Sequence, residues 1–393
     1  MFKFNVPKLA EGVFYVGVKD RDRRLFDSLI PLPQGTSYNA YLIKSEKVAL
    51  IDTVNPGFEQ ELESRVNQIH PIEELDYIIM NHAEPDHAGA IPYLMSKNSK
   101  ALLVATKKGA EAARVYFNVP DGRIKIVSDG GTIDLGSKTL RFIEAPMLHW
   151  PETMFTYLVE DKILFPCDFL GLHTAYGLYD DEVPEMLTYA QRYFGEIMMP
   201  YRSMCRKGLD KIKGLEIAVI APSHGPIHRN IKPIMDAYDR WTNGNTLEKV
   251  LVVYATMWRS TEKMIRQLVE TLNKEGVETR AYNLATADIG DVTMDLVDSR
   301  GIVLGTPTVL NKMHPLAVYA AHLVKVLRPP AKYGVVLTSY GWGKGALAHA
   351  SEVLGPTGLE VVGALEINGP PSAEAYASIR DIGVLLAKKI KTA

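Results

Sequence analysis

Four side chains that can bind a metal ion stand within six residues, in the stretch 82–87 with the sequence HAEPDH. The stretch follows an apolar run, Tyr77 to Met80, which predicts a buried strand. Pro85 removes a backbone donor and pushes Glu84 towards an extended conformation, so we expect a loop here and no regular helix. Two imidazoles and two carboxylates buried together need a cation to offset their charge. The stretch therefore predicts a metal site, against the simpler alternative of a solvated polar loop.

Three later polar residues also follow apolar runs that are typical of strands. His149 comes after the run 140–143 and a turn at Pro146, Asp168 comes after 163–165, and His224 comes after 217–220. Sheet proteins place site residues at such strand ends. The candidate ligands are then His82, Glu84, Asp86, His87, His149, Asp168 and His224. This many nitrogen and oxygen ligands, without a thiolate, suit two metal ions, and iron, manganese and zinc all remain open.

The motif HxExDH, followed by single His, Asp and His residues, resembles the metallo-β-lactamase fold, whose usual motif is HxHxDH. Glu84 stands where the hydrolases of that fold carry a second His, and in this the chain resembles the flavodiiron proteins, a family with a non-haem diiron centre. The segments GTSYNAYLI (35–43), MLHWPETM (147–154) and ILFPCDFLG (163–171) agree. A carboxylate in place of an imidazole makes the site harder, which favours iron over zinc. The resemblance implies that one iron is held by His82, Glu84 and His149 and the other by Asp86 and His224, that Asp168 bridges them, and that His87 either ligates or leaves its place to water.

The length of 393 residues favours two domains. With 44 basic and 46 acidic residues the net charge is −2, which argues against a nucleic-acid partner or an anionic membrane surface. The N-terminal stretch 1–12 lacks an apolar signal-peptide core and no run is long enough to span a membrane, so we expect a cytoplasmic protein. The two cysteines, Cys167 and Cys205, form no CxxC pair, which excludes a rubredoxin-type iron site. We expect Cys167 to be a small buried residue, turned away from Asp168 by strand alternation.

Short apolar runs separated by turn signals recur from residue 12 to about residue 230, which predicts a two-sheet sandwich covered by helices. Asp52 ends one such run, and we expect it to support the site or the fold without binding metal. Residues 185–201 predict an amphipathic helix that ends near Pro200. For His173 a structural or surface role is favoured over a place in the metal pocket.

The polar segment 241–245 is the candidate linker, which gives a metallo-β-lactamase-like diiron domain over 1–245 and a second domain over 249–393. The second domain opens with a strand-like run, 250–256, a loop rich in hydroxyl groups and a helical pattern from Met264. A helix start preceded by Thr256, Ser260 and Thr261 predicts an anion site, with simple helix capping as the alternative. Further strands alternate with helices, as in a doubly wound parallel sheet.

This half resembles flavodoxin in its TxWxST loop (256–261), its TPT segment (306–308) and its SYGWG loop (339–343). The resemblance implies an FMN site, with the phosphate on 256–261, the ring near the two later segments, and Trp258 and Trp342 packed near the ring. The predicted FMN-binding residues are Thr256, Met257, Trp258, Arg259, Ser260, Thr261, Pro307, Thr308, Asn311, Ser339, Tyr340, Gly341, Trp342 and Gly343.

Taken together, the two resemblances imply an oxidoreductase that reduces O2 to water, NO to N2O, or both, at two irons. Electrons would enter at FMN from an external donor such as rubredoxin or reduced deazaflavin F420. The family also implies a head-to-tail homodimer or a dimer of dimers. The alternative is a dinuclear zinc hydrolase fused to a flavodoxin electron carrier, and the metal content separates the two.

Overall fold

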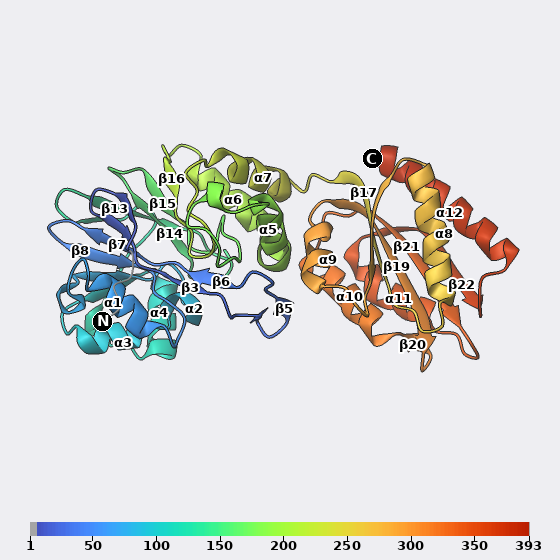
Figure 1. The fold of residues 1–393 in the computed structure, drawn as a ribbon, viewed down its shortest axis with the longest axis horizontal. Helices are drawn as coiled ribbons and strands as arrows, with labels where there is room; N and C mark the ends of the chain where they lie inside the picture. The colour runs from blue at the N-terminus through green and yellow to red at the C-terminus, as the bar shows by residue number, and fades with distance from the viewer. Residues whose placement is uncertain (1–5, 393) are drawn as a thin grey trace. The chain divides into compact units, whose positions relative to one another are not determined.

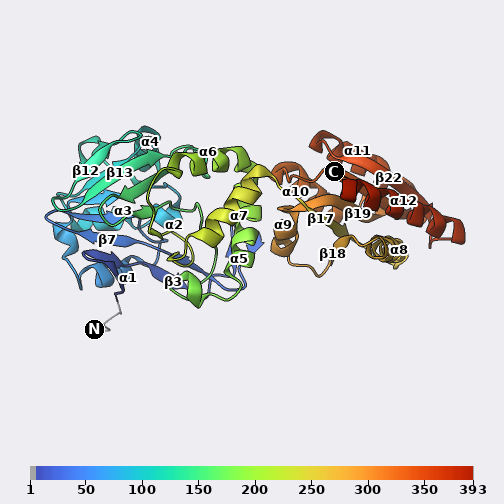
Figure 2. The ribbon, with the colours of Figure 1, turned by 90° about the horizontal axis from the view of Figure 1, so that it is seen from above.

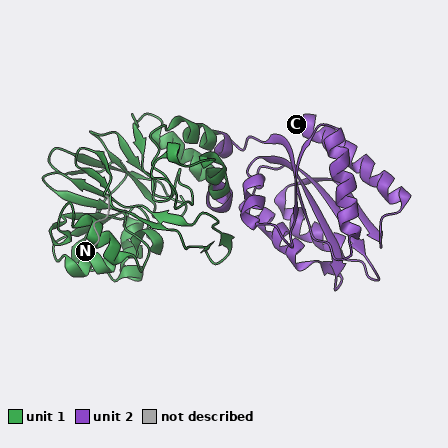
Figure 3. Cartoon of the chain, in the orientation of Figure 1, with its two compact units in different colours: residues 1–193, 201–239 green, residues 194–200, 240–393 purple. Residues whose placement is uncertain are grey.

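The computed structural model describes residues 6–392, and Figure 1 shows them as a ribbon. Residues 1–5 and 393 lie outside it, so the expectation that the N-terminal stretch 1–12 carries no signal peptide falls partly outside the described residues. The chain divides into two compact units, Met1–Tyr193 with Tyr201–Asp239 and Phe194–Pro200 with Arg240–Ala393 (Figure 3). Within residues 6–392, no helix is both long enough and apolar enough to cross a membrane.

The first unit is built on two sheets. The larger runs, in order of pairing, through β1 (Lys8–Ala10), β2 (Val13–Tyr15), β7 (Tyr41–Lys44), β8 (Val48–Ile51), β9 (Tyr77–Ile79), β10 (Leu102–Ala105) and β11 (Ile124–Ile126). The smaller consists of β12 (Thr132–Asp134), β13 (Thr139–Glu144), β14 (Met154–Leu158), β15 (Ile163–Phe165) and β16 (Val219–Ile220). Two short pairs, β3 (Val18–Asp20) with β6 (Thr36–Tyr38) and β4 (Leu25–Phe26) with β5 (Ile30–Pro31), complete the strands of this unit.

Side-chain alternation along the strands of the larger sheet gives it two buried faces. Leu50 and Ile78 belong to the core that includes residues of the helices α1 (Glu59–Val66), α3 (Ile91–Lys97) and α4 (Lys107–Phe117). Their neighbours Ile51 and Ile79 belong to the core shared with the smaller sheet. The helix α6 (Arg202–Ile212) also belongs to this unit, as does α7 (Lys232–Asn243) up to Asp239. The unit is the predicted αββα sandwich (Figure 1).

Two predictions of local structure in this part of the chain need correction. A short helix, α2 (Pro85–Ala88), begins inside the motif, because proline suits the first position of a helix; Glu84 before it is extended, as expected. The segment 185–201 is not one helix ended at Pro200. α5 (Met186–Tyr193) continues through the π-helical turn Phe194–Met198 and the 3-10 turn Met199–Tyr201 into α6.

The second unit is a parallel sheet with the strand order β18 (Glu278–Asn283), β17 (Leu247–Tyr254), β19 (Ser299–Val309), β21 (Tyr333–Tyr340) and β22 (Glu360–Asn368), plus β20 (Lys312–Met313) antiparallel to β19. In chain order this is 2-1-3-4-5, the flavodoxin arrangement. The helices α8 (Ser260–Lys274) and α12 (Ala373–Thr392) pack together on one face, and α9 (Ile289–Leu296), α10 (Pro315–Leu327) and α11 (Ala346–Leu354) lie on the other (Figure 2). The predicted doubly wound sheet is confirmed.

The connection before this sheet is shorter than the predicted linker. α7 runs to Asn243, and Trp241, predicted to be linker, is buried against Phe194. Gly244 takes a left-handed conformation with φ of 70°, and β17 begins at Leu247, two residues before the predicted domain start. Burial of the large apolar side chain of Trp241 thus extends α7 through a segment whose polar sequence indicates a loop.

Candidate functional site

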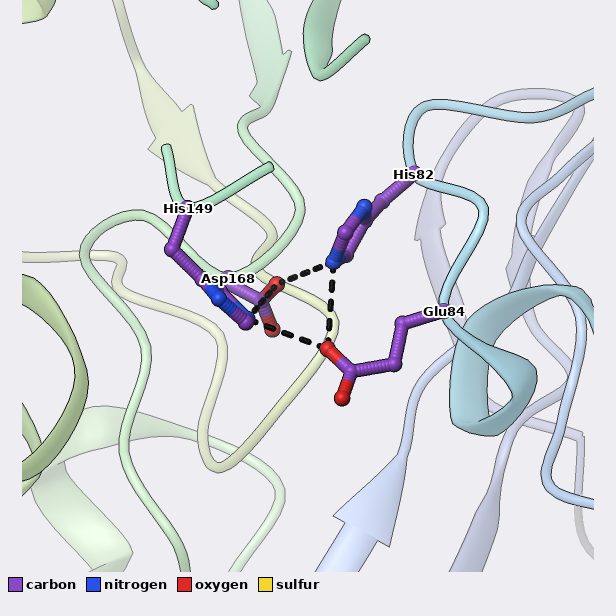
Figure 4. A group of neighbouring side chains, drawn as sticks. All are labelled: His82, Glu84, His149 and Asp168. Atoms are coloured by element: carbon purple, nitrogen blue, oxygen red, sulfur yellow. Dashed lines mark hydrogen bonds and ion pairs between the residues drawn. The ribbon is translucent and has the colours of Figure 1, made fainter. Parts of the chain in front are cut away.

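All the predicted metal ligands come together where strands of the two facing sheets end. They form two groups, His82 with Glu84, His149 and Asp168, and Asp86 with His87 and His224. Figure 4 shows the first group, with the four side chains pointing towards one another, His82 and Glu84 from one loop and His149 and Asp168 from two other segments. His82 and Asp168 follow β9 and β15 within three residues, as the strand-end reasoning predicts.

Asp168 lies between the two groups. Its Oδ2 is 3.5 Å from Nε2 of His82 and 3.6 Å from Nε2 of His149. Its Oδ1 is 2.9 Å from Nε2 of His87 and 3.5 Å from Nε2 of His224. A single carboxylate therefore turns one oxygen to each group.

Each group has a further carboxylate of its own. Oε2 of Glu84 is 3.2 Å from Nε2 of His82 and 3.0 Å from Nε2 of His149. Oδ2 of Asp86 is 3.1 Å from Nε2 of His224, and its Oδ1 is 3.4 Å from Nε2 of His87. The structure thus places His87, the residue that the family resemblance left open, inside the second group.

Asp52 holds two of the ligand loops in place. Its carboxylate accepts hydrogen bonds from the backbone N–H of Asn81 at 2.8 Å, from the side-chain amide of Asn81 at 3.1 Å, and from the hydroxyl of Ser223 at 3.0 Å. Asn81 directly precedes His82, and Ser223 directly precedes His224. Asp52 touches the segments that carry ligands, in keeping with the supporting role expected from its place at a strand end.

A second candidate site lies in the other unit, at the carboxyl ends of β17, β19, β21 and β22. It is a cavity of about 550 Å³. The predicted residues that line it are Thr256, Met257, Trp258, Ser260, Thr261, Pro307, Thr308, Ser339, Tyr340, Gly341 and Trp342. Arg259, Asn311 and Gly343 are not among the lining residues, whereas Lys263, Gly369 and Pro370, which the sequence reasoning missed, are.

Comparison with known proteins relates both halves of the chain to one family. Residues 36–225 match the family model described as ODP family beta lactamase. The chain is 37% identical over 361 residues to a nitric oxide reductase of Moorella thermoacetica, covering 90% of each chain, and 33% identical over 404 residues to a coenzyme F420H2 oxidase of Methanocaldococcus jannaschii, covering 98% of this chain and 97% of the other.

Two solved structures also match over almost the whole chain. The rubredoxin oxygen:oxidoreductase of Desulfovibrio gigas has a TM-score of 0.96 and 28% identity, covering 98% of this chain and 99% of the other. The flavodiiron protein of Giardia intestinalis has a TM-score of 0.94 and 30% identity, covering 99% and 97%. The chain belongs to the flavodiiron protein family. The alternative of a zinc hydrolase finds no support in the names of these relatives.

The ionisation of the site fits the metal centre of a flavodiiron protein. Burial opposes charge on Glu84 and Asp86, yet the neighbouring histidines lower the pKa of both to about 2. Burial also opposes a charge on His87, but Asp86 and Asp168 raise its pKa to about 9. A buried imidazole that retains a proton in this way marks a place where positive charge is favourable. A metal cation supplies that charge without the proton.

Unpaired polar atoms in the same place support the fit. Among residues 6–392, Asp86 Oδ1, Asp168 Oδ2 and Nδ1 of His87 are buried without a hydrogen-bond partner. Orphaned buried polar atoms are costly, and a bound ion is one of the few things that satisfies them. The donor set therefore suits two metal ions.

The cavity in the second unit fits a flavin phosphate and ring. The hydroxyls of Thr256 and Thr308 are buried without a hydrogen-bond partner among the described residues, and no side chain caps the N-terminus of α8. Free N–H groups at a helix start, with its positive dipole end, bind phosphate. Trp258 and Trp342 line this cavity and are 87% and 83% exposed. Large aromatic side chains exposed in this way are suited to stacking on a planar ligand such as the flavin ring.

One expectation about a neighbouring residue needs correction, and another is narrowed. Cys167 is buried as predicted, but its sulfur lies within 4.8 Å of the ligand atoms of His87 and Asp168. β15 ends at Phe165 and Cys167 has a φ of 53°, so strand alternation does not apply to it. His173 is 7% exposed and its ring centre is 4.7 Å from that of His224, so of the structural and surface roles favoured for it only the structural one remains.

Sequence reasoning missed two residues that contact the ligands. The hydroxyl of Tyr193 donates a hydrogen bond to Oδ1 of Asp168 at 3.0 Å. Glu152, within the segment 147–154 that supports the family resemblance, meets His82 at 2.7 Å. Neither follows a strand directly, so the strand-end pattern that found the ligands could not indicate them.

Proposed function

We propose that the chain is a flavodiiron reductase that passes electrons from an external donor through FMN to two irons, where O2 is reduced to water, NO to N2O, or both. The proposal assigns the irons to a domain spanning 1–245 and FMN to a domain spanning 249–393. The names of the relatives, which include a nitric oxide reductase, an F420H2 oxidase and a rubredoxin oxygen:oxidoreductase, support these substrates and two kinds of donor.

The observation that carries the proposal is the position of Asp168, whose two oxygens face separate groups of ligands. His82, Glu84 and His149 would hold one iron, and Asp86, His87 and His224 the other, with Asp168 shared. When bound, a pair of irons can hold two electrons and bind a diatomic molecule. Glu84 in place of a third imidazole in its group makes that group harder, which favours iron over zinc.

The surrounding residues set the conditions for that chemistry. His82, His87, Asp168 and His224 are each no more than 1% exposed, so these ligands are screened from bulk water, whereas Glu84 and His149 are partly exposed. The carbonyl of Ser37 accepts a hydrogen bond from Nδ1 of His224 at 2.6 Å, which leaves Nε2 of that ring, the nitrogen beside Asp86 and Asp168, free to bind metal.

FMN would occupy the cavity of the second unit. The hydroxyls of Thr256 and Thr308 and the N-terminus of α8 would bind its polar groups, and Trp258 and Trp342 would flank its ring. Arg259, Asn311 and Gly343 would complete the site from the adjoining loops. FMN accepts electrons in a pair or singly and passes them on singly.

The proposed assembly is a head-to-tail homodimer, or a dimer of such dimers. Two exposed apolar surfaces support it. Trp258 and Trp342 line the flavin cavity, and Leu310, two residues after the cavity residue Thr308, is 83% exposed. A groove of about 620 Å³ beside His149 is lined by Val115, Tyr116 and Trp150, with Val115 75% exposed. Contact between these surfaces on two copies would bury them and bring one copy's flavin to the other copy's metal centre.

The decisive experiment is analysis of protein expressed with iron and riboflavin supplied. We expect about two irons and one FMN for each chain, and anaerobic turnover of NO, set beside O2 consumption, with reduced rubredoxin or reduced F420 as donor. Two zinc ions without iron, together with ester or thioester hydrolysis, would replace the reductase with the hydrolase alternative. Comparing the two donors and the two gases on one preparation decides the substrate and the donor.

A further inference from the structure

The imidazoles of the metal centre differ in what their second ring nitrogen meets. Nδ1 of His82 is 2.7 Å from Oε1 of Glu152, a carboxylate. Nδ1 of His224 meets a neutral carbonyl, that of Ser37, and Nδ1 of His87 has no hydrogen-bond partner among residues 6–392. Of these three Nδ1 atoms, only that of His82 meets a charged acceptor.

Glu152 is itself held firmly. Its side chain is buried, with the residue 5% exposed, and the same Oε1 accepts a second hydrogen bond from the backbone N–H of Ala83 at 3.0 Å. Its backbone carbonyl accepts a hydrogen bond from the hydroxyl of Thr106 at 2.9 Å. Because Ala83 directly follows His82, the carboxylate fixes both the ring of His82 and the start of its loop.

A carboxylate on Nδ1 has two effects on an imidazole that binds metal. It holds the proton on Nδ1, so that Nε2 presents a lone pair, and it raises the basicity of that lone pair. Nε2 of His82 is the nitrogen that faces Glu84 and Asp168. The two effects therefore act at the metal position of the first group.

We propose that Glu152 is a positioning residue that sets the ring of His82 and makes the position lined by His82, Glu84 and His149 bind a divalent metal more tightly than the position lined by Asp86, His87 and His224. The inference rests on the proposed metal centre, but not on iron or on the reduction of NO or O2. Its consequence is that the two positions fill in sequence, the first group before the second.

The alternative is that Glu152 only anchors the loop at Ala83. The two roles differ in the variants Glu152→Gln and Glu152→Leu. A glutamine oxygen still accepts from both Ala83 and His82, so it keeps the anchor and the ring orientation but removes the charge, whereas leucine removes all three. Glu111→Gln is the matched control, since Glu111 lines the same surface groove as Glu152, is exposed, and removes one negative charge near the site.

The experiment is a titration of the full-length, metal-free protein with Co2+, followed by its visible absorption and by competition with a chelator. Wild-type protein should bind two Co2+ in separate steps. Glu152→Gln should weaken the tighter step about 10-fold and Glu152→Leu about 10- to 100-fold, with the weaker step and the Glu111→Gln control unchanged. Thermal unfolding of each metal-free variant reports whether it is folded.

Three results would overturn the inference. Both steps could be unchanged in a folded Glu152→Leu protein, both steps could weaken equally together with a loss of thermal stability, or wild-type protein could bind two equivalent ions. If Glu152→Leu does not fold, Glu152→Gln alone carries the test. Wild-type protein that binds Co2+ in two steps but reduces neither gas would refute the proposed function and leave this inference standing.

Discussion

Raising the pH should destabilise the metal-free protein relative to the metal-loaded one. His87 is 1% exposed; burial opposes a charge on it, but Asp86 and Asp168 raise its pKa from 6.5 to about 9. In the metal-free protein the proton on His87 offsets these carboxylates. In the metal-loaded protein the metal ion offsets the charge of these carboxylates, so the proton on His87 is not required.

The magnitude follows from the two pKa values. A group whose pKa is raised by folding adds stability that is complete below the unfolded value and disappears as the pH rises through the folded value. For His87 the loss falls between pH 6.5 and about 9, and at about 1.36 kcal/mol for each pH unit it amounts to about 3 kcal/mol. His82 acts in the same direction, because Glu152 and Glu84 outweigh the effect of burial and raise its pKa well above the usual value.

The assay is urea unfolding of metal-free and metal-loaded protein at about pH 6 and about pH 9. Lys19 acts in the opposite direction. Burial lowers its pKa from 10.5 to about 8, so the free-energy cost of burying its charge is lost as the pH rises above about 8. Its effect is common to both forms and cancels in the comparison. His87→Asn should remove part of the difference. If the metal-free protein loses no stability relative to the loaded one, the imidazoles do not hold these protons and the charge argument fails.

Three further outcomes are expected. Asp168→Ala should abolish turnover of NO and O2 and lower the metal content, while FMN stays bound, because its cavity lies in the other unit; full turnover would refute the ligand assignment. Thr256→Val and Thr308→Val should each weaken FMN binding about 5-fold, since a hydrogen bond is worth about 1 kcal/mol. Flavin fluorescence measures this against the control Thr279→Val, whose hydroxyl bonds Asn273 away from the cavity. Phe165→Ala, in the core between the sheets, should cost about 3 to 5 kcal/mol in urea unfolding and leave the FMN affinity of the folded protein unchanged.

The sequence predicts the sandwich, the doubly wound sheet and the metal ligands for one reason. Buried strands appear as apolar runs, and a polar residue just past such a run lies at the edge of a sheet. His82, Asp168 and His224 are separated by dozens of residues, yet this rule brings them together, and the structure places them in contact. The edge strand β18 has no such signature, because its sequence ETRAYN is largely polar and mostly half-buried or exposed.

Residues whose position depends on long-range contacts could not be predicted in this way. Glu152 lies 70 residues from His82, and Tyr193 lies 25 residues from Asp168, each in a segment without strand character. Lys263 reaches the flavin cavity from the first turns of α8, where a charged residue normally indicates a solvated face. Gly369 and Pro370 could have been predicted, since they directly follow β22 as the predicted residue Gly341 directly follows β21.

The hydrogen bonds of Asp52 determine which mutations near the metal site alter the spacing of the ligand loops. One carboxylate fastens Asn81 and Ser223, so the gap between the two ligand loops is set by the width of a single side chain and not by the length of either loop. Insertions at the outer ends of these loops should leave the ligand spacing as it is. Exchanging a single atom, as in Asp52→Asn, would instead point a donor at the Asn81 amide or the Ser223 hydroxyl and loosen both loops together.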